Sequence, residues 1–187
     1  MEWFADVVTQ GVAAPVIALR LTLATLLGGL LGWEREARDK PAGLRTHMLV
    51  SIGSATFTLL GFETGAELSD QGGEDGHVDV DPTRIIQGII GGLGFLGAGS
   101  IIKAKGSEDV SGLTTAASVW YTGALGVACG MGTYLLALIS AVLGVLVLSV
   151  LGRVSKKDAE VGKPARAELR SQTTSGTEAE NAHSAPE

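Results

Sequence analysis

Stretches with at most one charge divide much of the chain into four intervals, each long enough to cross a hydrocarbon core about 30 Å thick. They run from Val12 to Trp33, between Arg45 and Glu63, between Arg84 and Lys103, and from Val110 to Gly152. The fourth interval is about twice as long as one span needs. Gly130 to Thr133, near its middle, have the composition of a tight turn, so this interval predicts two spans. We therefore expect an all-α, polytopic membrane protein with about five transmembrane helices.

The composition favours the same class. Hydrophobic residues make up 45% of the 187 residues, and 27 glycines raise the combined share above that of an ordinary soluble domain. The single cysteine, Cys129, excludes both a disulfide framework and a cysteine-rich metal site. A net charge of -6 excludes a broadly basic protein that binds nucleic acid.

The distribution of Lys and Arg predicts the orientation, because positive residues are retained on the cytoplasmic side of a membrane. Four lie in the segment 34–45, two in 103–109 and six in the tail after Gly152, against one in the segment 63–84. This twelve-to-one split alternates as five spans require. It predicts an N-terminus outside the cell and a C-terminus in the cytoplasm.

Three regions follow from these patterns. Residues 1–11 form a short external N-terminus, which is acidic and lacks the positive start of a cleaved signal peptide. Residues 12–152 form the five-helix transmembrane domain. Residues 153–187 form a cytoplasmic tail, which we expect to be disordered because it is polar and has no apolar periodicity.

Arg20 is the one charged residue inside a predicted span. A charge at this depth costs a few kcal/mol, so such a residue usually finds a partner or reaches water. The candidate partners are Glu63, Asp81, the amide oxygen of Gln87, or a carboxylate on another protein. Alternatively, the side chain extends along its own helix to the outer headgroups.

The predicted spans contain no Asp or Glu, so an ion path through them would need backbone carbonyls at a broken helix. The glycine-rich third span could supply such a break. Close helix packing is the alternative, because several glycines are four residues apart, the spacing at which helices approach closely. These pairs are Gly28 and Gly32, Gly88 and Gly92, and Gly126 and Gly130. The glycines of the third span that could serve packing or a pore are Gly88, Gly92, Gly94, Gly97 and Gly99.

Catalytic and metal-binding patterns are weak. The histidines His47, His77 and His183 lie on different sides of the predicted membrane and form no triad, zinc motif or Cys–His pair, so we expect no enzyme. His47 could titrate near neutral pH or could be a hydrogen-bonded residue at a helix end. Seven acidic residues between Glu63 and Asp81 suit either weak Mg²⁺ or Ca²⁺ binding or a solvated loop without a specific ligand.

Six motifs follow one another along the chain: Leu19 to Leu21, Gly28 to Glu36, Lys40 to Val50, Asp81 to Ile86, Gly94 to Gly99, and Gly112 to Trp120. Together they resemble the MgtC/SapB family of bacterial and archaeal membrane proteins. The resemblance covers about residues 15 to 150. It implies a multi-pass protein of the inner (plasma) membrane that supports growth at low Mg²⁺ by regulating other membrane proteins. The alternative that it implies is a transporter or channel for Mg²⁺ or another divalent cation.

The resemblance also implies site residues and partners. The matching positions are Arg20, Glu34, Arg45, Thr46, His47, Arg84, Thr114 and Thr115, to which Gln87 is added as a candidate partner of Arg20. The expected partners are the lipid bilayer, other membrane proteins and a second copy of the chain, with Mg²⁺ as an effector or substrate and no other cofactor. Longer family members carry a folded cytoplasmic domain after the last span, and the 35 residues from Arg153 are too few to form it.

Overall fold

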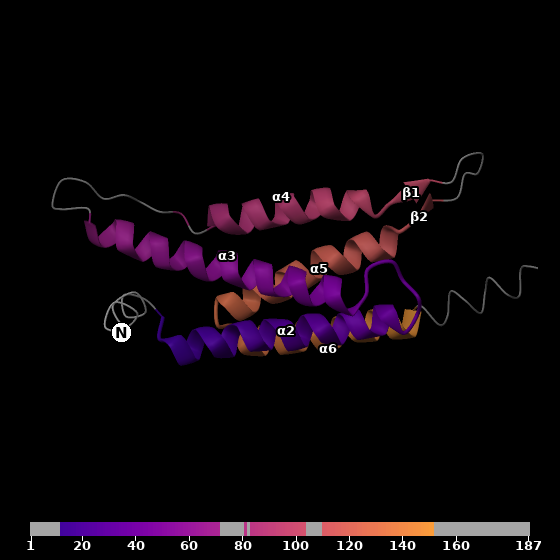
Figure 1. Cartoon of the computed structure of the whole chain (residues 1–187), viewed down its shortest axis with the longest axis horizontal. Helices are drawn as coiled ribbons and strands as arrows, with labels where there is room; N and C mark the ends of the chain where they lie inside the picture. The colour runs from indigo at the N-terminus through magenta and orange to yellow at the C-terminus, as the bar shows by residue number, and fades with distance from the viewer. Residues whose placement is uncertain (1–11, 72–80, 82, 104–109, 152–187) are drawn as a thin grey trace, which may run out of the picture. The chain divides into compact units, whose positions relative to one another are not determined.

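The computed structural model describes residues 12–71, 81, 83–103 and 110–151 (Figure 1). The predicted external N-terminus 1–11, the predicted tail 153–187, His77 and His183 lie outside the described residues. Five α-helices dominate the described part: α2 (Ala14–Glu36), α3 (Leu44–Gln71), α4 (Thr83–Gly99), α5 (Leu113–Gly130) and α6 (Tyr134–Leu146). A short antiparallel ribbon, β1 (Ile102–Lys103) with β2 (Val110–Ser111), joins α4 to α5. The all-α prediction is confirmed for this part of the chain, the ribbon aside.

Helix α2 has the length and apolar composition of a membrane-spanning helix, and the segment Tyr134–Val150 is a shorter apolar helical stretch. Pro15 lies in the first turn of α2, where a proline costs no hydrogen bond. At the other end, Asp39 adopts a left-handed φ of 53° and the backbone N–H of Lys40 donates to the Arg35 carbonyl, 3.1 Å away. This closing turn stops the helix.

The helix boundaries agree with the uncharged intervals except in one place. The turn predicted at Gly130 to Thr133 is confirmed, since α5 ends at Gly130 and α6 begins at Tyr134. The expectation that a loop begins near Glu63 is wrong, because α3 continues through Gln71. Residues 63–71 contain good helix formers and no proline, so nothing in their sequence stops the helix earlier.

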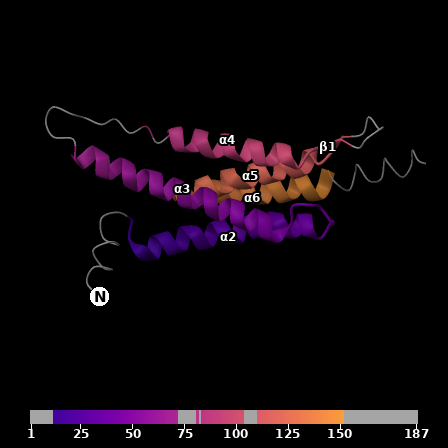
Figure 2. The same cartoon turned by 45° about the horizontal axis from the view of Figure 1, so that its top comes forward.

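Within the compact unit that ends at Val145, the helices run alternately in opposite directions (Figures 1 and 2). The α2–α3 connection and the β-ribbon lie at one end of this bundle, while the α5–α6 turn lies at the other. Arg35, Arg38 and Arg45 therefore share an end with Lys103. The described basic residues of the predicted loops cluster at this end, whereas Arg20 and Arg84 lie toward the other end.

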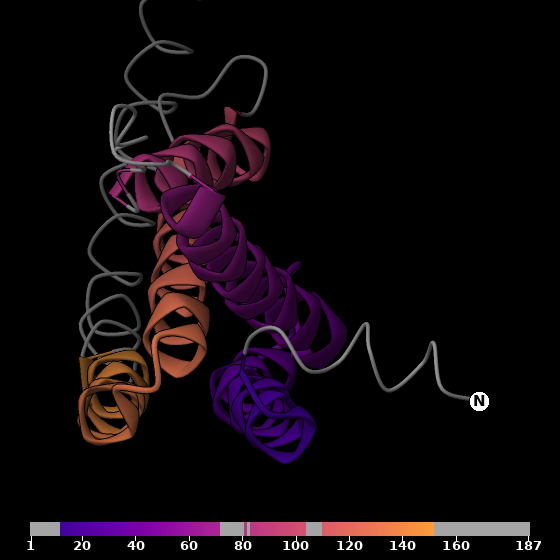
Figure 3. The same ribbon diagram turned by 90° about the vertical axis from the view of Figure 1, so that its left-hand side faces the viewer.

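Helix α3 packs against both α2 and α5, and α4 packs mainly on α5 (Figure 3). Small residues from four helices form the core: Ala24, Ala55, Ala128, Cys129 and Ala137. Helix α6 is joined to α5 by the Tyr121 hydroxyl, which donates to the Ser140 carbonyl, 2.7 Å away. The second compact unit begins at Leu146, and its described residues include a π-helical turn, Val147–Leu151.

Candidate functional site

A charged cluster lies where α2 ends and α3 begins. The Glu34 carboxylate forms ion pairs with Arg35, 3.3 Å away, and with Arg38, 2.5 Å away. Arg35 is buried, so this pairing is better shielded from water than a surface ion pair. The Glu36 carboxylate accepts a hydrogen bond from the Leu44 backbone N–H, at 2.7 Å, and so satisfies an otherwise free donor at the start of α3.

His47 lies one turn into α3 and is fully buried. Its Nδ1 is 2.8 Å from the Gly43 carbonyl oxygen, and its Nε2 is 3.2 Å from the Ser118 hydroxyl of α5. Because a carbonyl can only accept, Nδ1 carries a proton, and in neutral His47 the Nε2 atom then accepts from Ser118. The Ser118 hydroxyl is also 2.9 Å from the Thr115 carbonyl and has two acceptors to choose between. His47 is thus a hydrogen-bonded residue near a helix end, which is one of the two predicted roles.

Small and hydroxyl side chains fill the contact between α3 and α5. His47, Ser51, Ser54 and Thr58 recur at helical spacing on α3 and are buried, as are Thr115, Ser118 and Thr122 on α5. The hydroxyls of Thr58 and Thr122 donate to carbonyls of their own helices, four residues earlier. These bonds satisfy the Thr58 and Thr122 hydroxyls locally, whereas the buried Ser51 hydroxyl has no hydrogen-bond partner among the described residues.

Glycines make this approach possible. A Cβ atom at Gly126 would lie 2.2 Å from the Ser51 carbonyl oxygen of α3, and one at Gly130 would lie 2.8 Å from the Ala55 carbonyl oxygen. At the contact between α2 and α3, a Cβ at Gly28 or Gly32 would lie 2.7 Å from α3 backbone atoms. The packing interpretation is therefore confirmed for the pairs Gly28 and Gly32, and Gly126 and Gly130.

The third pair, Gly88 and Gly92 on α4, behaves differently. No atom of the described structure lies within 4 Å of a Cβ built at either glycine, and the same holds for Gly94 and Gly99. Gly97 alone of the predicted set contacts another helix, at Ala116 of α5. Helix α4 runs unbroken from Thr83 to Gly99, so the break that a carbonyl-lined path requires is not present in it.

Arg20 finds a partner that the sequence did not suggest. Its Nη1 donates to the Gly130 carbonyl at the C-terminus of α5, 2.7 Å away. The expected partners Glu63, Asp81 and Gln87 are wrong, because within the described residues this backbone carbonyl takes their place. A cation is favourable at this place, since the last carbonyls of a helix carry a partial negative charge. The turn that follows leaves room for the guanidinium only because residue 132 is a glycine, with φ of 78° and a Cβ position 2.9 Å from Arg20 Nη2.

The remaining predicted residues are scattered. Arg45 and Thr114 are exposed near the end of the bundle that holds Glu34 and His47, while Thr46 is half-buried and Thr115 is buried. Arg84 and Gln87 are exposed on α4, away from that end. The structure thus brings Glu34, His47 and Thr115 to one end of the bundle, and it separates them from Arg20, Arg84 and Gln87.

Three members of the polar end were missed by the sequence reasoning: Arg35, Arg38 and Ser118. The spacing of hydroxyl residues on two predicted helices was the available signal for Ser118. No group of three or more His, Cys, Asp or Glu residues that could hold a metal ion is found in the part of the chain that the structure describes.

The MgtC family model matches residues 21–157, which include all five described helices except the first turns of α2. The chain belongs to the MgtC family. It is 42% identical over 135 residues to "Putative magnesium transporter YhiD" of Escherichia coli, covering 71% of this chain and 59% of YhiD. It is 39% identical over 147 residues to "Protein SrpB" of Synechococcus elongatus (75% of this chain, 77% of SrpB) and 35% identical over 134 residues to "Protein SapB" of Bacillus subtilis (72% and 52%).

The family match extends across the charged cluster, the buried His47 and the glycine-rich α4. The chain spans under two thirds of YhiD and about half of SapB. No solved structure matches this member of the MgtC family.

Proposed function

We propose that this MgtC-family chain is a multi-pass protein of the inner or plasma membrane that supports acclimation to low Mg²⁺ by binding and regulating partner membrane proteins. The proposal includes five spans with the N-terminus outside, and it is supported by the alternating helices and by the basic residues gathered at one end. Catalysis has no part in this proposal.

The observation that carries the proposal is the unbroken α4. A cation crossing a membrane needs oxygen ligands, from acidic side chains or from carbonyls that a broken helix exposes. In α4 the carbonyls are engaged in a continuous helix, and the two grooves beside it are lined almost entirely by apolar side chains. The described interior is therefore suited to helix packing rather than to ion passage.

The outward surfaces suit lipid and other membrane helices. Phe95 on α4 is 85% exposed and Leu135 on α6 is 72% exposed, and many other large apolar side chains of the described residues are exposed as well. A soluble protein rarely leaves so much apolar surface uncovered, whereas a membrane protein covers it with acyl chains or partner helices.

A divalent-cation transporter is the second candidate, because the relative YhiD is named as a putative magnesium transporter. Reconstitution of the full chain into liposomes that enclose a fluorescent Mg²⁺ reporter separates the two functions. We expect uptake no faster than in protein-free liposomes, with circular dichroism showing that the reconstituted protein is helical. Saturable uptake above that control would overturn the regulator. Introducing Gly94→Leu, at a position where an added Cβ meets no described atom within 4 Å, would then show whether α4 takes part in the path.

The regulator is tested separately in cells. A strain that lacks the gene should grow poorly at low Mg²⁺, and the full chain should restore growth while remaining inactive in the liposome assay. If the chain restores growth and the purified chain also takes up Mg²⁺ in liposomes, regulation through partners is contradicted.

A further inference from the structure

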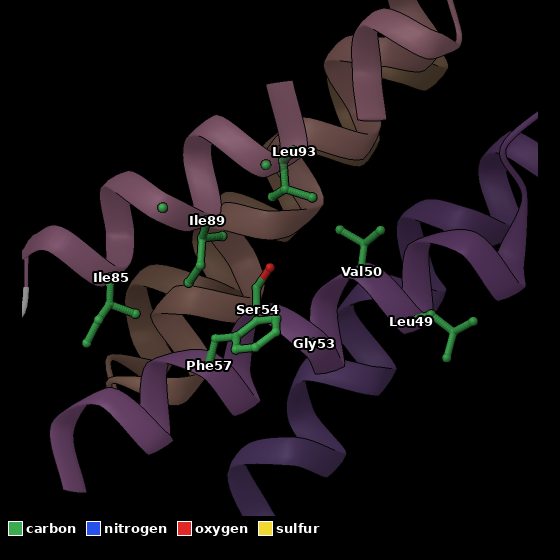
Figure 4. A pocket seen from close by; sticks show the side chains of 10 residues that line it. Leu49, Val50, Gly53, Ser54, Phe57, Ile85, Ile89 and Leu93 are labelled. Carbon is green, nitrogen blue, oxygen red and sulfur yellow. The ribbon is translucent and has the colours of Figure 1, made fainter. Parts of the chain in front are cut away.

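A groove of about 520 Å³ lies between α3 and α4 (Figure 4). Its walls are apolar, with Phe57 on α3 and Ile89 on α4 among the larger side chains. Three glycines also line it: Gly53 on α3, and Gly88 and Gly92 on α4. A Cβ atom at any of the three would meet no atom within 4 Å, so the backbone of both walls is open to the groove.

One polar group points into this apolar space. Ser54 is 4% exposed, and its hydroxyl projects into the groove (Figure 4). The hydroxyl makes no hydrogen bond to any described residue, although the Ser54 carbonyl accepts one from Thr58. Because this hydroxyl opens onto the groove, it can donate a hydrogen bond to an acceptor that enters there.

We infer that the occupant is helix α4 of a second copy of this chain. Gly88 and Gly92 have the spacing at which two membrane helices come into backbone contact. A helix that carries glycines on its contact face leaves its backbone carbonyls accessible, and such a carbonyl is an acceptor that Ser54 can reach. In a two-fold symmetric pair, each α4 enters the groove between α3 and α4 of the other copy, so both grooves are filled by the same contact.

Charge at the start of α4 supports a second copy over an arbitrary helix. Asp81 lies just before α4 and Arg84 lies in its first turn, and Gly88 follows one turn after Arg84. Both are exposed, and the Asp81 Oδ1 atom accepts hydrogen bonds from the backbone and side chain of Thr83. In a parallel pair, Arg84 of each copy can face Asp81 of the other, and two copies in one membrane have this parallel orientation. The surface therefore complements itself in shape and in charge.

Disulfide cross-linking in native membranes tests this pairing, which does not depend on the proposed function. In a Cys129→Ala background, Ile89→Cys places a thiol in the groove and Leu138→Cys places one on α6, where the native side chain is 53% exposed. We expect oxidation to give a covalent dimer through residue 89 and little through residue 138. Adding Gly92→Leu should lower the residue 89 dimer about tenfold by blocking the backbone contact. Because the groove side of Gly92 is open, this variant should keep the helicity of the parent, as circular dichroism would show.

A residue 89 dimer no more abundant than the residue 138 dimer would overturn the inference. So would a residue 89 dimer that Gly92→Leu leaves unchanged, because the glycine contact would then not hold the copies together. In either case lipid or a different protein fills the groove, while the liposome and growth results for the proposed function would stand.

Discussion

Replacing Gly126 by alanine places a methyl group at the closest contact between α5 and α3. The new Cβ would lie 2.2 Å from the Ser51 carbonyl oxygen, 2.8 Å from Ser54 Cβ and 3.0 Å from the Ser51 carbonyl carbon. Two of these atoms belong to the α3 backbone, which also packs closely against α2 at Gly28. The clash cannot be relieved by turning a side chain, so the helices must separate.

The expected cost follows from two opposing effects. Overpacking a filled interior costs about 1–3 kcal/mol, and a contact with backbone belongs at the upper end of this range. Alanine in a helix interior is more favourable than glycine by about 1 kcal/mol. We therefore expect Gly126→Ala to lower the free energy of unfolding by about 2 kcal/mol.

Gly94→Ala is the matched control, since it makes the same chemical change inside α4 where no atom lies within 4 Å. It should leave stability unchanged or raise it by up to about 1 kcal/mol. Reversible unfolding in mixed micelles, followed by the fluorescence of Trp33 and Trp120, measures both variants against the parent chain. Equal stability of the two variants, or a more stable Gly126→Ala, would refute the packing of α5 on α3 described above.

Three further predictions concern polar contacts. Arg20→Leu should lower the free energy of unfolding by about 1.5–3 kcal/mol, because it removes the charge-assisted hydrogen bond to the C-terminus of α5. Arg20→Lys should cost less. Unchanged thermal unfolding of the leucine variant would contradict the contact. His47→Ala and Ser118→Ala should each lower the free energy of unfolding, and a double-mutant cycle should give a coupling energy of about 0.5–1.5 kcal/mol. If the two losses simply add in the double variant, the hydrogen bond between His47 and Ser118 is not formed. Asp81→Ala should loosen the first turn of α4, seen as faster amide hydrogen exchange there. Hydrogen bonds from the side chain and backbone of Thr83 hold the pKa of Asp81 below its ordinary value. The stabilisation of the first turn by Asp81 is therefore complete above about pH 4 and is lost as the pH falls through the lowered pKa. Amide exchange that does not change with pH in this range would contradict the capping role of Asp81.

Much of the fold could be predicted because its signals are local. An apolar stretch of some twenty residues favours a helix wherever it lies, since its backbone groups are then satisfied within the segment. The turn between α5 and α6 was predicted for a similar reason, because glycines at 130 and 132 mark it. The extent of α3 beyond Glu63 was missed because charge was taken as the end of the helix, although charged residues continue a helix in water. The number and orientation of the membrane spans remain predictions.

The candidate site was predicted less well, because each member depends on contacts between distant segments. Arg20 was recognised as needing a partner, but its partner is a backbone carbonyl 110 residues away, and every residue type carries a carbonyl. His47 was recognised as a candidate, whereas Ser118 became its partner only through the crossing of α3 and α5. A residue type identifies the polar groups that need partners, but it does not say which helix brings one.

The same division holds for the glycines. The sequence by itself determined the helices, the basic end of the bundle and three glycine pairs at the spacing of close contact. Only the tertiary structure decided that the pairs on α2 and α5 pack on α3, while Gly88 and Gly92 on α4 remain open. The three pairs have the same spacing, and they differ because a glycine face packs only where the bundle places another helix against it.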